Sequence, residues 1–135
     1  MKKLIAGLAL LFVCSTTGEA QDANKIQGTW TPQFAESEGR KQTEAEVKFR
    51  FAGDKLIFLE KSGKAKEATF TLDASKKPAE IDMMVGANTV KGIYRLMGDT
   101  LWICMSRPGE GRPKTFQTVG TKAMLVVFRR EKDSK

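Results

Sequence analysis

The side chains that most often carry enzyme chemistry are scarce in this chain. Its 135 residues include no histidine and two cysteines, Cys14 and Cys104. Charge-relay triads and the usual zinc sites depend on histidine or on several thiolates, so we predict no metal site and no cofactor. Acid–base catalysis would fall to carboxylates. Those closest to recognisable motifs are Asp73, Glu80, Asp82 and Asp99.

Turn geometry offers a simpler role for several aspartates. Asp54 and Asp99 each follow a glycine, and Asp73 opens the turn-rich run 73–78. A short carboxylate in a turn accepts backbone N–H bonds, which explains these residues without a reaction. We therefore predict no catalytic residue and no enzyme activity.

The first 20 residues have the three parts of a secretory signal. Lys2 and Lys3 precede an apolar run over 4–13, and small and polar residues follow as far as Ala20. We predict cleavage after Ala20, which leaves 21–135 as a single domain, and export to the periplasm or the cell exterior. No later run reaches the roughly 20 apolar residues of a spanning helix, so no transmembrane segment is expected.

Export also affects the cysteines. In a lipoprotein signal Cys14 would accept lipid, but Val13 stands where such a signal has a small residue, so loss of Cys14 with the leader is favoured. Cys104 then remains alone, and no disulfide can form within the chain. It lies in the apolar run 101–105, where a thiol usually behaves as a small buried hydrophobe and not as a reactive group.

The charge pattern argues against a nucleic-acid partner. The formal net charge is +7, but lysines and arginines are mixed with acidic residues and form no long run of like charge. A solvated basic surface is the simplest interpretation. Weak attraction to an anionic envelope polymer is the alternative.

Alternating and apolar runs predict an all-β chain. Val47, Phe49 and Phe51 alternate with charged residues, as in a strand with one face in the core. Further strands are expected at 31–37, 56–59, 68–72, 80–85, 90–96, 101–106 and 123–128. Short turns between consecutive strands favour an antiparallel up-and-down meander of about eight strands, closed into a small barrel that leaves no exposed edge.

Three predicted strands, at 56–59, 101–105 and 124–128, are apolar on both faces. Their outer faces need cover from a loop, a neighbouring subunit or a second layer. A long connection containing glycine and proline is expected over 107–120. In the first strand, Pro32 indicates an edge position or a bulge, because it cannot donate a ladder hydrogen bond.

The candidate ligand-binding residues are large aromatics and one arginine with its neighbour. They are Trp30, Tyr94, Trp102, Arg112 and Phe116. Tryptophan and tyrosine supply a stacking surface with one polar group, although both are more often part of a core, and Trp30 is favoured as a plug of the barrel. Arg112 would either cap the barrel or recognise an anion at its rim.

Short motifs follow one another in a fixed order from about residue 25 to residue 130. They are Gly28-Thr29-Trp30, Phe51-Ala52-Gly53-Asp54-Lys55, Phe70-Thr71-Leu72-Asp73, Lys76-Lys77-Pro78, Ile81-Asp82, Gly92-Ile93-Tyr94, Gly98-Asp99-Thr100-Leu101, Cys104, Arg112-Pro113, Phe116 and Arg129-Arg130. This ordered set resembles a family of short exported proteins known mainly from planctomycete bacteria, described as lipocalin-like domains of unknown function. Gly28-x-Trp30 is also similar to the opening motif of lipocalins, whose tryptophan closes one end of the barrel. The resemblance implies a lipocalin-like barrel and, by analogy, Arg112 or Arg129 stacked across Trp30.

Together these observations favour a non-enzymatic binding barrel, monomeric or weakly dimeric. The expected ligand is a small apolar or amphipathic molecule, in a cavity lined by strand residues such as Phe49, Phe58, Phe70, Met83, Tyr94 and Ile103. The alternative is an interaction module, in which a solid barrel docks on an envelope protein or polymer through its outer face. A hydrolase with two converging carboxylates is a third, less favoured hypothesis.

Overall fold

The computed structural model of the protein describes residues 17–44 and 46–132. Most of the predicted leader lies outside these residues, and its cleavage stays a prediction. Among the described residues, no helix has the length and apolar character needed to pass through a lipid bilayer.

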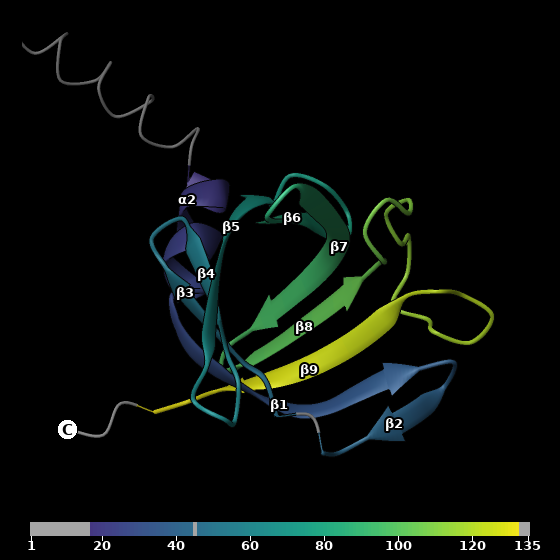
Figure 1. Cartoon of the computed structure of the whole chain (residues 1–135). Coiled ribbons are helices and arrows are strands. Elements are labelled where there is room, and N and C mark those ends of the chain that lie inside the picture. Colours follow the sequence, from purple (N-terminus) through teal and green to yellow (C-terminus); the bar gives the residue numbers. More distant parts are fainter. Residues whose placement is uncertain (1–16, 45, 133–135) are drawn as a thin grey trace, which may run out of the picture.

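The described part of the chain forms one helix and nine strands. They are α2 (Thr17–Lys25), β1 (Gly28–Ser37), β2 (Arg40–Gln42), β3 (Lys48–Ala52), β4 (Lys55–Leu59), β5 (Ala65–Asp73), β6 (Ala79–Val85), β7 (Asn88–Met97), β8 (Thr100–Met105) and β9 (Met124–Arg130). Each strand from β3 to β8 pairs antiparallel with the next, and β1 pairs with both β3 and β9. The predicted antiparallel barrel of eight strands, lipocalin-like in its architecture, is therefore confirmed (Figure 1).

Two elements were not anticipated from the sequence. β2 pairs with the last residues of β1, where Ala35 lies opposite Gln42, and stands outside the closed ring. The helix α2 spans the predicted cleavage point after Ala20 and lies at one end of the barrel (Figure 1). We call this the closed end, and the opposite end, which carries the segment 106–123 between β8 and β9, the mouth.

Period-two alternation sets the interior as expected. Phe49 and Phe51 of β3 point inward and are at most 8% exposed, whereas Arg50 between them is exposed. In β1 the register against β9 shifts between Pro32 and Phe34, which is the bulge that Pro32 predicted. The fully buried centre of the barrel includes Ile26, Trp30, Leu56, Ile81, Leu101, Ile103 and Phe128.

A second apolar cluster lies on the outer face of β7, β8 and β9. Ile93, Cys104, Leu125 and Val127 form it, and Phe116 of the long loop, as we call 106–123, packs against them. The loop thus supplies the cover predicted for the outer faces of β8 and β9. Cys104 has no exposed surface, in agreement with the prediction of a buried hydrophobe.

Candidate functional site

Trp30 anchors the closed end of the barrel. Its side chain is fully buried, and Nε1 donates a 2.8 Å hydrogen bond to the carbonyl of Ile26. The guanidinium of Arg130 lies over the indole, with Cζ 4.3 Å from the ring centroid. The predicted stacking partners, Arg112 and Arg129, are therefore wrong. Because Phe128 points inward, alternation along β9 directs Arg129 outward and brings Arg130 back to the end of the barrel.

Arg130 also ties the chain segment before β1 to the barrel. Nη1 donates to the carbonyl of Gln27 at 2.8 Å, and Nη2 donates to the carbonyl of Lys25 at 2.6 Å. Nε pairs with Oδ1 of Asp99 at 3.1 Å, so this turn carboxylate serves an arginine and not the backbone N–H bonds expected of it. Gly28 has a φ of +118°, a conformation that favours glycine over any other residue.

Further contacts join α2 and its connection to the turns of the closed end. The hydroxyl of Tyr94 donates to Oδ2 of Asp22 at 2.6 Å, and Tyr94 is 2% exposed. The amide of Gln27 exchanges two hydrogen bonds with the backbone of Gly53, at 2.7 Å and 3.0 Å. Trp30 and Tyr94 thus belong to a seal, which agrees with the interpretation of Trp30 as a plug.

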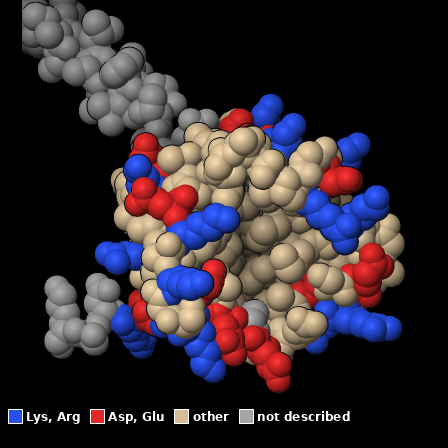
Figure 2. Space-filling view, viewed as in Figure 1, with Lys and Arg blue, Asp and Glu red and all other residues tan. Residues whose placement is uncertain are grey.

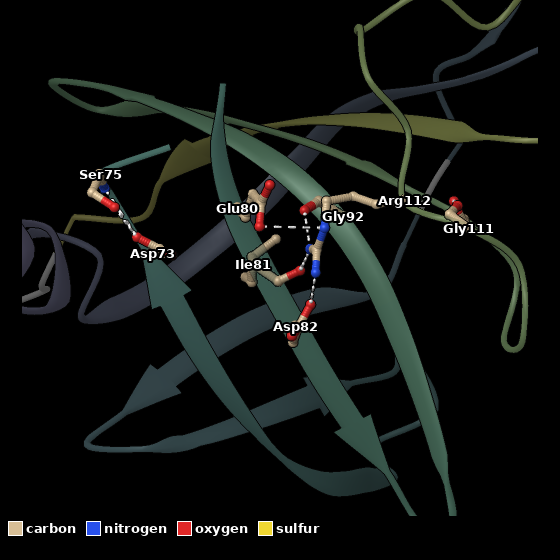
Figure 3. Close-up of polar contacts among 9 residues, drawn as sticks. Asp73, Ser75, Glu80, Ile81, Asp82, Gly92, Gly111 and Arg112 are labelled. Atoms are coloured by element: carbon tan, nitrogen blue, oxygen red, sulfur yellow. Dashed lines mark hydrogen bonds and ion pairs between the residues drawn. The ribbon is translucent and has the colours of Figure 1, made fainter. Parts of the chain in front are cut away.

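Arg112 lies on the outside of the barrel, over β6 and β7. Its guanidinium lies between two carboxylates (Figure 3). Nε is 3.4 Å from Oε1 of Glu80, and Nη2 is 2.8 Å from Oδ1 of Asp82. Nη1 also donates to the carbonyls of Ile81 and Gly92, at 3.2 Å and 2.9 Å. This arginine is fully engaged by the chain itself, so its position explains how the long loop is held and leaves little capacity for an external anion.

The strand β7 is shaped to lie close to β8 beneath this contact. A Cβ atom placed on Gly92 would be 2.8 Å from the carbonyl oxygen of Cys104. Only glycine permits this approach without a shift of the backbone. Gly92 therefore has a packing role within the motif that it shares with Tyr94.

Trp102 and Phe116 pack against each other on the outer face. Their ring centroids are 5.7 Å apart with an edge-to-face angle of 84°. The guanidinium carbon Cζ of Arg95 lies over the indole of Trp102, 5.9 Å from the ring centroid. The structure therefore distributes the five predicted ligand-binding residues over three places: the closed end, the outer cluster and the contact of Arg112 with β6.

The reactive groups named from the sequence have structural surroundings. Burial, together with a smaller effect of the Glu36 carboxylate, raises the pKa of the Cys104 thiol to about 11. The hydroxyl of Ser75 donates to Oδ1 of Asp73 at 2.6 Å, a bond that lowers the pKa of Asp73 below its usual value. The backbone N–H of Ser75 also donates to Asp73, as the turn interpretation predicted. Among the described residues, no group of three or more acidic or thiol side chains is placed to hold a metal ion.

The predicted cavity residues do face the interior, but they pack against one another. The ring of Phe49 lies 4.9 Å from that of Phe58 and 4.6 Å from that of Phe128, measured between centroids. Phe51 and Phe70 are in edge-to-face contact at 4.9 Å. These rings occupy the middle of the barrel, so space for a ligand has to be sought nearer its ends.

The mouth has such space. A groove of about 410 Å³, which we call the mouth groove, runs between the ends of β1 and β8 and the starts of β7 and β9. Its lining includes Ser37, Glu38, Val90, Met105, Arg107, Lys122 and Met124. A second groove of about 560 Å³ adjoins it and shares Ser37, Glu38 and Met124. Figure 2 shows basic and acidic side chains mixed around the edge of the face in view, with mostly uncharged atoms at its centre.

The rim of the mouth groove is fastened by one buried hydroxyl. Thr118 is 1% exposed, donates to Oε2 of Glu36 at 2.7 Å and accepts the N–H of Gly39 at 2.9 Å. The turn between β1 and β2 is thereby held against the long loop. The sequence analysis did not single out Val90, Met105 and Met124 as site residues. The available signal was an apolar residue at the end of a predicted strand, next to the long loop or to a predicted turn.

Fold and site together define a small closed antiparallel β-barrel of lipocalin-like architecture, with a sealed end and a grooved mouth. The chain matches no protein-family model, no curated protein and no solved structure. The resemblance to exported lipocalin-like domains therefore stays a prediction.

Proposed function

We propose that the protein is a non-enzymatic binding module that holds a small apolar or amphipathic molecule in the mouth groove. The observation that carries the proposal is the position of this groove at the mouth of the barrel. Its lining includes Val90 of β7 and Met105 of β8, which also pack against the core. Its volume of about 410 Å³ falls within the range of about 300–1,000 Å³ that is usual for small-molecule sites. The leader predicted over 1–20 supports a place of action outside the cytoplasm.

The interaction-module hypothesis receives less support from the geometry. It requires an apolar patch on the outside of the barrel that is open to a partner. The outer cluster of Cys104, Leu125 and Val127 is covered by the protein's own long loop. Trp102 and Phe116 face each other there, which leaves the small-molecule hypothesis as the better supported one.

Methionine methyl groups provide a direct test, because the chain has methionines at both ends of the barrel. Met105 and Met124 line the mouth groove, whereas Met97 lies at the closed end and is 50% exposed. With methionine methyls labelled for NMR, titration with decanol is expected to shift the signals of Met105 and Met124 and to leave Met97 unchanged.

A matched pair of variants controls for nonspecific contact with an exposed methionine. Met124 is 39% exposed, so Met124→Lys and Met97→Lys each place a charge at a similarly exposed methionine. We expect Met124→Lys to abolish the decanol shift at Met105 and Met97→Lys to preserve it. Equal shifts at all methionines, or none at the mouth, would contradict the proposal.

A further inference from the structure

We propose that the ligand of the mouth groove is a single-chain amphiphile with a monoanionic head, of the fatty-acid kind. This inference rests on the proposed function and specifies its substrate class. Its basis is the charge at the lip of the groove, where Arg107 and Lys122 line the same space as Val90 and Met105. An apolar floor next to cationic side chains matches a molecule with a hydrocarbon chain and an acidic head.

The cations of the lip are available to a ligand. Arg107 and Lys122 are exposed and form no ion pair with any described residue. Arg40, which lines the adjoining groove, is also exposed and free of ion pairs within the described part. Arg112 and Arg130, by contrast, are each paired with a carboxylate. A bound carboxylate would give the lip the partner that the protein does not provide.

One acidic residue narrows the choice of head group. Glu38 lines both grooves and is exposed, in a turn where its φ is +51°. Its carboxylate repels any anion bound at the lip, and it repels a doubly charged phosphate more than a singly charged carboxylate. The carboxylate of Glu36 is occupied by the hydroxyl of Thr118, and Glu110 lines a separate pocket that shares Lys122 with the mouth groove. The balance of two cations against one acidic residue in the lining of the mouth groove favours a monoanion.

The size of the groove limits the number of hydrocarbon chains that the ligand can have. Its volume of about 410 Å³ lies toward the lower end of the usual range of about 300–1,000 Å³, which suits one short hydrocarbon chain better than two. The hydrocarbon chain of the ligand would extend over Val90 and Met105, because these are the inward-facing apolar residues of β7 and β8 at the mouth. The head would remain at the lip, where charged groups keep their contact with water.

Four probes of equal chain length separate the inference from the proposed function. They are decanoate, decanol, decyl phosphate and decyltrimethylammonium, each titrated against the full protein by calorimetry and by the methyl signals of Met105 and Met124. We expect decanoate to bind most tightly, with an affinity that falls as salt is added. Equal affinities for decanoate and decanol would overturn the inference and leave the proposed function standing. Failure of all four to bind would overturn both, and tightest binding of decyl phosphate or of the cationic probe would overturn the choice of a monoanion.

Charge variants then locate the head group. Arg107→Gln and Lys122→Gln are each expected to weaken decanoate binding about two- to fivefold, the range of exposed ion pairs, and to leave decanol binding unchanged. Glu38→Gln is expected to strengthen decanoate binding, about twofold. The matched control consists of the two single variants Lys76→Gln and Lys77→Gln. Each removes one exposed positive charge at the closed end, as each lip variant does at the mouth. If this control weakened decanoate binding as much as the lip variants did, an effect of net charge alone would replace the inference.

Discussion

The closed end and the mouth of the barrel differ in how their segments are held. At the closed end, one arginine bonds to two backbone carbonyls and an aspartate and covers a buried tryptophan. At the mouth, the hydroxyl of Thr118 joins the β1–β2 turn to the long loop, and exposed Arg107 and Lys122 stand beside a groove. The polar contacts that close over a buried tryptophan thus lie at the end opposite the candidate site.

The largest expected effect is the loss of the closed-end plug. Trp30→Ala removes a fully buried indole together with its bond to Ile26, so we expect the free energy of unfolding to fall by about 3–5 kcal/mol. Trp102→Ala is the matched control, because Trp102 is half-buried on the outer face. It should cost clearly less in urea unfolding followed by circular dichroism. If both variants lost the same stability, the contrast between the plug and the outer cluster would fail.

A smaller effect is expected from the two adjacent arginines at the end of β9. Arg130→Lys keeps the charge but removes the fork that reaches both Gln27 and Lys25, so we expect a loss of about 1–3 kcal/mol in the free energy of unfolding. Arg129→Lys changes an exposed side chain and should stay within about 0.5 kcal/mol of the parent. The same urea experiment measures both. A cost at Arg129 as large as that at Arg130 would contradict a specific stabilising role for the stacked guanidinium of Arg130.

The sequence was sufficient for the barrel because alternation is a local property. The pattern of Val47, Phe49 and Phe51, repeated in later runs and separated by glycine turns, specifies strands, their faces and their order. The same alternation, continued two residues beyond Phe128, indicates Arg130 as the arginine at the barrel end. The choice of Arg129 was therefore an error of phase and not a limit of the sequence.

The site was harder to predict because it depends on contacts that have no period. The long loop is placed by Arg112, whose two backbone partners, Ile81 and Gly92, lie 31 and 20 residues earlier in the chain. Nothing in the local run around Arg112 identifies Ile81 and Gly92 as those partners. The helix α2 is similar, since its place is set by Asp22 meeting Tyr94 across 72 residues. The position of the mouth groove follows from such distant contacts, and so do the residues that line it.

The smallest effect concerns how firmly the long loop covers the outer cluster, and Cys104 reports on it. Arg112→Gln removes the ion pairs with Glu80 and Asp82, so the loop should open more often and expose the thiol. We expect a thiol reagent to label Cys104 about tenfold faster in this variant at pH 8, as a loss of about 1.4 kcal/mol in the free energy of local opening would give. Arg107→Gln, a change in the same loop without an ion pair, should leave the rate unchanged.

The pH of this labelling experiment follows from the thiol itself. Burial holds the pKa of Cys104 at about 11 in the folded protein, above its ordinary value of 9.0. The unfolded thiol therefore ionises first as pH rises, and the stability linked to this group is present below pH 9 and is lost between about pH 9 and 11. At pH 8 the exposed thiol is mostly protonated, and its small thiolate fraction is the same in every variant, so a faster rate in Arg112→Gln reports more frequent opening of the loop. If the rate at pH 8 were the same in both loop variants, the loop would be held by Phe116 and the outer cluster, and the mouth would be no less firmly built than the closed end.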